Sequence, residues 1–118
     1  DAQLVRTGGW GAAAGRQAAT ALLTSEPEID AFLCASDRIA RGVLAVLHEH
    51  DVAIPSQVKV IGFDDHHFAR ELEPPLTTVA QPFSTQGARA VDLLVATISG
   101  KQPTVERLES TLIVRDST

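Results

Sequence analysis

The sequence predicts an α/β fold in which a parallel β-sheet is flanked by helices. Short apolar segments alternate with segments of helical length along the chain. The run Ala31–Ala35 is apolar throughout, which is typical of a strand buried on both faces of a parallel sheet, and Val58–Phe63 is predicted to be a second buried strand. The stretch between them is long enough for the helical crossover that a parallel pair requires. A strand–helix–strand unit is therefore the predicted centre of the fold.

The other elements follow from turn residues and apolar periodicity. Helices are predicted over residues 12–24, 38–50 and 84–99, where segments of helical period follow a glycine, a capping residue or a proline. Strands are predicted at 4–5, which has the character of a strand end, and at 31–35, 58–63, 76–80 and 111–115. Ser36 and Asp37 are both able to cap the second helix, and capping is the role we expect for Asp37.

Composition limits the class of protein. The 118 residues suffice for one domain, and 44% hydrophobic with 21% charged residues is typical of a soluble globular chain. No apolar stretch is long enough to cross a membrane, so we expect no membrane contact. The net charge of −5 argues against direct binding to a nucleic-acid phosphate backbone. The single cysteine, Cys34, lies in an apolar run and is expected to be buried, and the lack of an internal disulfide favours the cytoplasm.

The carboxyl ends of the two central strands carry hydroxyl and carboxylate groups, Ser36–Asp37 after the first strand and Asp64–Asp65 after the second. Open α/β sheets bind ligands beyond this edge, because loops there present polar groups without breaking the sheet. A carboxylate accepts hydrogen bonds from two adjacent hydroxyls, and Trp10, in a glycine-rich loop, is suited to stacking on the apolar face of a sugar ring. These residues therefore predict a binding site for a sugar or polyol.

Five blocks of residues follow one another along nearly the whole chain: Ala31–Gly42, Val60–Asp65, Pro74–Val79, Gln81–Pro82 with Gly87, and Leu112–Thr118. In this order they resemble the LacI/GalR family of bacterial transcription regulators. The resemblance implies part of an effector-binding domain with the type I periplasmic-binding-protein-like fold, in which two α/β subdomains close over a small molecule. It implies that about 1–80 and 111–118 form the C-terminal subdomain. It also implies that about 81–110 form a crossover and a helix, which normally pack on the N-terminal subdomain.

The resemblance also assigns roles to individual residues. It places the effector contacts at Trp10, Ser36, Asp64 and Gln81. It places the surface of a symmetric dimer at Arg41, Phe68, Glu71 and Leu72. Ser36 stands where the family most often has asparagine, and a hydroxyl offers fewer hydrogen bonds than an amide. This departure implies either an effector that differs from a common hexose or a water molecule that fills the gap.

As a regulator of this kind, the chain is expected to bind a small effector (a sugar, polyol or nucleobase) and to form a homodimer. Operator DNA is expected to be reached only through an N-terminal headpiece that precedes this segment in the family. No catalytic residue, cofactor or metal is expected. In the family, the helix corresponding to 84–99 docks on the other subdomain. Its apolar stripe must therefore be covered by some other surface in this chain. We expect repacking, subunit exchange or partial disorder of that helix. The stripe consists of Val91, Leu94, Val95 and Ile98.

Other functions stay open at this stage. A periplasmic sugar-binding component of an ABC transporter shares the fold and the pocket chemistry, and a signal peptide or a helix-turn-helix ahead of this segment would distinguish the two. A small α/β enzyme or phospho-receiver is disfavoured, because the sequence has no P-loop, no GxGxxG fingerprint and no paired carboxylates near its N-terminus. The adjacent His66 and His67 offer at most a partial metal site.

The candidate residues also have purely structural interpretations. Trp10 could cover the edge of the core, and Asp64 could hold a turn by accepting backbone hydrogen bonds. Ser36 could be only a helix cap. Phe68 and Leu72 could pack internally if their segment is a short helix.

Overall fold

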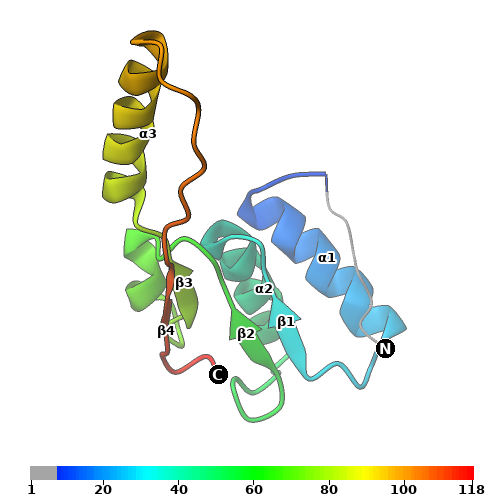
Figure 1. The fold of residues 1–118 in the computed structure, drawn as a ribbon. Helices are drawn as coiled ribbons and strands as arrows, with labels where there is room; N and C mark the ends of the chain where they lie inside the picture. Colours follow the sequence, from blue (N-terminus) through cyan, green and yellow to red (C-terminus); the bar gives the residue numbers. More distant parts are fainter. Residues whose placement is uncertain (1–7) are drawn as a thin grey trace.

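In the computed structural model, which describes residues 8–118, helices and short strands alternate as the sequence predicts (Figure 1). The helices are α1 (Ala12–Ser25), α2 (Asp37–Glu49) and α3 (Phe83–Ile98), with a 3-10 helix, η1 (His67–Glu71), between α2 and α3. The strands are β1 (Ala31–Leu33), β2 (Lys59–Ile61), β3 (Thr78–Ala80) and β4 (Thr111–Ile113). Each α-helix begins and ends within one residue of its predicted bounds, whereas the strands are shorter than predicted. The predicted strand end at 4–5 lies outside the described residues.

The centre of the fold is the predicted parallel pair. β1 and β2 run parallel, with Phe32 opposite Val60, and α2 forms the crossover between them. β3 extends this sheet, because Thr77 bridges Ile61 in parallel and the amide of Gly62 donates to the carbonyl oxygen of Thr77 over 2.9 Å. β4 then pairs with β3 in the antiparallel direction, so the strands lie side by side in Figure 1. The predicted α/β class is confirmed.

The hydrophobic core joins α2 to one face of the β1–β2 pair and to α1. In β1, Phe32 is buried, as is Cys34 just beyond the strand, whereas Leu33 is 82% exposed. The expectation that this strand is buried on both faces is therefore wrong. The reason is that α1 packs against α2, and within residues 8–118 nothing covers the face on which Leu33 lies.

α3 stands apart from the rest of the described chain (Figure 1). None of its residues is buried, and the side chains of the predicted apolar stripe are exposed: Val91, Leu94, Val95 and Ile98. Repacking of this helix, one of the three expected outcomes, is not observed.

No helix in the described part of the chain is long and apolar enough to span a membrane.

α1 and α2 approach closely because a glycine of each helix faces the backbone of the other. A Cβ atom on Gly15 would overlap the carbonyl oxygen of Ile39 in α2, and a Cβ atom on Gly42 would overlap the carbonyl oxygen of Ala12 in α1. Close-packed interiors do not make room for added atoms without moving their neighbours. The two glycines therefore set the distance between the helices, and with it the position of the loop around Trp10 that leads into α1.

Replacing Gly42 with alanine is expected to lower the free energy of unfolding by about 1–3 kcal/mol, because the helices must separate to accept the methyl group. Urea denaturation measures this change. Gly87→Ala is the matched control: Gly87 lies in α3 with nothing within 4 Å of an added Cβ atom. There the same substitution is expected to be neutral or to stabilise by up to about 1 kcal/mol. Equal effects at the two positions would contradict the close packing of α1 and α2.

Candidate functional site

The carboxyl ends of β1 and β2 lie next to each other, because the amide of Asp37 donates to the carbonyl oxygen of Phe63 over 2.8 Å. This bond places Ser36, the residue before α2, beside the turn that begins at Asp64. The Ser36 hydroxyl donates to the carbonyl oxygen of Trp10 over 3.4 Å. The loop before α1 is thereby tied to the same edge of the sheet.

Gln81 completes this edge from the end of β3. Its Nε2 donates to Oδ1 of Asp64 over 2.7 Å, and neither residue is fully buried. Trp10 is 73% exposed, so its indole face is open to a ligand. The four residues to which the resemblance assigns effector contacts thus lie along one edge of the sheet. Their contact with an effector stays a prediction.

Ser36 has a structural role at this edge. It is the N-cap of α2: its Oγ accepts from the amide of Ile39 over 3.3 Å, and only 7% of its surface is exposed. With one lone pair and its proton already engaged, the hydroxyl has one lone pair left for a ligand. The expectation that Asp37 acts as a cap is wrong, because Asp37 is the first helical residue and its carboxylate binds other segments.

Asp37 is buried, with 1% of its surface exposed. Its Oδ1 accepts from the hydroxyl of Thr78 over 2.6 Å, and its Oδ2 accepts from the amide of His66 over 2.6 Å. Burial raises the pKa of Asp37, the two hydrogen bonds oppose this shift, and the nearby carboxylates of Asp64 and Asp65 add to it. One carboxylate therefore links the start of α2 to β3 and to the turn after β2.

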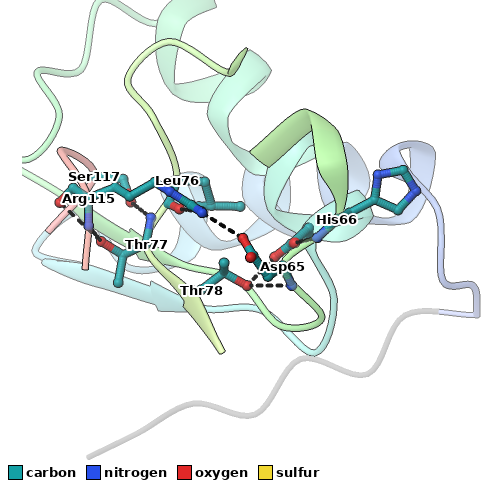
Figure 2. A network of polar contacts seen from close by, with 8 residues as sticks. Asp65, His66, Leu76, Thr77, Thr78, Arg115 and Ser117 are labelled. Atoms are coloured by element: carbon teal, nitrogen blue, oxygen red, sulfur yellow. Dashed lines mark hydrogen bonds and ion pairs between the residues drawn. The ribbon is translucent and has the colours of Figure 1, made fainter. Parts of the chain in front are cut away.

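Asp65 binds an arginine. Nη2 of Arg115 lies 2.6 Å from Oδ1 of Asp65, and Nη1 of the same arginine donates to the carbonyl oxygen of Leu76 over 2.7 Å (Figure 2). Both members of the ion pair are largely shielded from solvent. Because Asp65 is engaged in this way, Asp64 is the better placed of the two acids to meet a ligand.

Three residues that build this site were missed by sequence reasoning in that role: Asp37, Thr78 and Arg115. All three lie in blocks that carry the family resemblance, but for Asp37 and Thr78 local patterns indicate only a helix cap and a strand residue. Arg115 has no local signal, because its acidic partner lies 50 residues away along the chain.

The four residues to which the resemblance assigns the dimer surface lie on α2 and in or just after η1. The guanidinium carbon of Arg41 lies 4.8 Å from the ring centroid of Phe68, so these two residues form one surface. Glu71 is exposed, whereas Leu72 packs partly against the core. The segment contains a short helix, η1, as the structural alternative required. That alternative, in which Leu72 packs inside the protein, is confirmed in part. Contact with a second subunit stays a prediction.

The remaining candidates concern metal and thiol chemistry. Within residues 8–118, no group of three or more potential ligand side chains is placed to hold a metal ion. The rings of His66 and His67 instead lie against each other, with centroids 4.3 Å apart. Cys34 is buried as predicted, and burial raises the pKa of its thiol to about 12. The thiol therefore stays protonated at neutral pH, and a protonated thiol is a poor nucleophile.

Over residues 2–118 the sequence matches the family described as periplasmic binding protein-like domain. The chain belongs to this family. One relative is the lactose operon repressor of Klebsiella pneumoniae, which is 41% identical over 111 residues; the match covers 93% of this chain and 31% of the repressor. The resemblance to LacI/GalR-type regulators is thereby confirmed.

Solved structures of such regulators share the fold. A complex of the transcriptional regulator CelR with cellobiose superposes with a TM-score of 0.89 at 36% identity, covering 94% of this chain and 35% of CelR. The lac repressor dimer bound to operator and the anti-inducer ONPF gives 0.86 at 30% identity, covering 94% of this chain and 39% of the repressor. The predicted periplasmic-binding-protein-like fold is confirmed, and the chain spans about a third of the length of the relatives it matches.

The raised pKa of Asp37 makes stability depend on pH. Because the folded-state pKa exceeds the unfolded-state value, stability that is present in acid is lost as pH rises through the folded-state pKa. We expect the free energy of unfolding of the wild type, minus that of Asp37→Asn, to fall as pH rises from about 4 and then to level off. Urea denaturation at a series of pH values measures this difference. A difference that grows with pH would show that the hydrogen bonds from Thr78 and His66 outweigh burial.

Proposed function

We propose that this chain is the effector-sensing and dimerisation region of a LacI/GalR-type DNA-binding transcription regulator, and that its effector is a sugar or a related small polar molecule. The observation that carries the proposal is the Asp64–Gln81 pair and the exposed face of Trp10 at the carboxyl edge of β1 and β2. α/β folds bind ligands at this edge. The relatives reported above are transcription regulators, which favours this function over that of a periplasmic transport component.

The chemistry of this edge suits a ligand with several hydroxyls. The bond from Gln81 engages one carboxylate oxygen of Asp64 and fixes its orientation, and the second oxygen is the group that we expect to accept from ligand hydroxyls. The indole of Trp10 offers an apolar face for a sugar ring. Ser36 holds the Trp10 loop in place and contributes its remaining lone pair.

The rest of the proposed protein follows from the family. By the family pattern, about 1–80 and 111–118 belong to the C-terminal subdomain, while about 81–110 pack on an N-terminal subdomain whose surface covers the exposed stripe of α3. Closure of the two subdomains over the effector changes the dimer geometry, and with it the spacing of the headpieces on operator half-sites. The protein acts in the cytoplasm as a homodimer, contacts DNA only through its headpieces, and catalyses no reaction.

Effector binding is tested by a calorimetric screen of sugars, sugar alcohols and nucleobases against the full-length protein that contains this chain. We expect a sugar or polyol to bind, and Asp64→Ala to weaken that binding about tenfold or more, because a hydrogen bond to a charged group contributes about 1.5–3 kcal/mol. Asp30→Ala is the matched control, since Asp30 is an exposed acid at the amino end of β1. No binding in the screen, or equal binding by the wild type and Asp64→Ala, would contradict the proposed site.

The dimer surface is tested by sedimentation of the full-length protein. Arg41→Ala and Phe68→Ala are each expected to raise the dimer dissociation constant about tenfold or more, because arginine and aromatic side chains are enriched among the residues that dominate interface energetics. Arg16→Ala removes an exposed guanidinium that pairs with the exposed Glu49, and we expect it to leave the dimer unchanged. Dimerisation that is insensitive to both interface substitutions would place the interface elsewhere.

A further inference from the structure

We propose that Asp37 and Thr78 are positioning residues for Asp64: they hold the turn 64–66 in the conformation that presents the Asp64 carboxylate to Gln81 and to the effector edge. This inference rests on the proposed function of that edge. Neither residue is itself an effector contact, because Asp37 is 1% exposed and Thr78 is fully buried. Both act through the backbone of the turn.

The turn after β2 has a backbone conformation that its own residues do not favour. Asp64 has a φ of 106° and Asp65 a φ of 48°, both in the region that favours glycine. Aspartate reaches positive φ more readily than most residues other than glycine, yet each such position is uncommon. Two in succession are held in part by partners from outside the turn.

Three consecutive amides of the turn are bound by other segments. The amide of Asp64 donates to a backbone carbonyl oxygen of β3 over 2.9 Å. The amide of Asp65 donates to the hydroxyl oxygen of Thr78 over 3.3 Å (Figure 2). The amide of His66 donates to Oδ2 of Asp37 over 2.6 Å. These three bonds, together with the ion pair between Asp65 and Arg115, oppose relaxation of the turn to more favourable angles.

A buried hydrogen bond joins the two groups that hold the turn. The hydroxyl of Thr78 donates to Oδ1 of Asp37 over 2.6 Å, so the oxygen that receives the amide of Asp65 is itself oriented by the carboxylate that receives the amide of His66. Gly62 makes room for this carboxylate, since a Cβ atom there would overlap Oδ1 of Asp37. Asp37 and Thr78 are thus confined, and they hold the amides of Asp65 and His66, the two residues that follow Asp64.

The position of the Asp64 carboxylate depends on this arrangement. Asp64 directly precedes the two amides that Thr78 and Asp37 bind, and its carboxylate meets Gln81, which follows β3 by one residue. Losing either holding group frees the turn to move toward more favourable angles. The Asp64 side chain then turns away from Gln81, and the edge loses its oriented carboxylate.

The test follows the contact between Asp64 and Gln81 without any ligand. The side-chain amide signal of Gln81 in a ¹H–¹⁵N spectrum of the full-length protein reports this bond, and Asp64→Ala defines the position of the signal when the bond is absent. Asp37→Ala and Thr78→Val are expected to move the signal to that position. Thr78→Ser keeps the hydroxyl and is expected to restore the wild-type position. A signal that stays at the wild-type position in both Asp37→Ala and Thr78→Val overturns the proposal.

A substitution that only destabilises the fold is the control. Ser117→Ala removes a buried hydroxyl that accepts from the amide of Thr77 and donates to the carbonyl oxygen of Val60. These bonds are made to Thr77 and Val60, and neither involves an amide of the turn 64–66. We expect Ser117→Ala to lower thermal stability and to leave the Gln81 signal in place. If it moves the signal as far as Asp37→Ala does, general loosening explains the effect and the proposal is wrong.

Calorimetry with cellobiose and lactose separates this proposal from the proposed function. If the wild type binds either sugar through Asp64, Asp37→Ala and Thr78→Val are expected to weaken binding about tenfold, whereas Ser117→Ala changes it less than about twofold. Unchanged binding by both positioning variants overturns the proposal. In another outcome, the full-length protein binds nothing in the effector screen while the Gln81 signal still moves as expected in Asp37→Ala and Thr78→Val. That result refutes the proposed function and supports the positioning of Asp64.

Discussion

Asp37 carries a carboxylate that is almost entirely shielded from water, and a buried charge is tolerated only where hydrogen bonds replace its hydration. Those bonds come from Thr78 and His66, which lie 41 and 29 residues further along the chain. Satisfying one acid therefore requires the start of α2, the turn after β2 and the start of β3 to meet at one point. The crossover helix and the neighbouring strands are brought into register by that requirement, and the candidate site lies beside it.

A second set of polar contacts fastens the end of the chain to the same sheet (Figure 2). The hydroxyl of Ser117 accepts from the amide of Thr77 and donates to the carbonyl oxygen of Val60. Arg115 reaches Leu76 and Asp65 from just beyond β4. The chain leaves the sheet after β3 and returns as β4, so these contacts attach the returning segment to the neighbouring strands and, through Arg115 alone, to the turn that carries Asp64.

Most of the fold could be predicted from the sequence because its determinants are local: glycine, proline and apolar periodicity located the three α-helices to within one residue. The exposure of Leu33 could not be predicted, because burial depends on which elements pack on a strand. Trp10, Ser36 and Asp64 were predicted from the polar carboxyl ends of the strands and from the family resemblance, and Gln81 from the resemblance alone; the structure brings them to one edge. Asp37 was assigned as a cap because capping is a local rule, whereas its partners, and the arginine partner of Asp65, belong to distant segments.

A single residue, Asp65, separates Asp64 at the effector edge from His66, after which η1 begins with its share of the proposed dimer surface. Recognition and signalling in the proposed regulator therefore meet within one short peptide and need no relay of side chains between them. Trp10 and Gln81, two further proposed effector contacts, lie by contrast on other segments of the chain. In the proposed regulator, a change of effector specificity at these two positions therefore leaves the peptide that joins Asp64 to η1 unaltered.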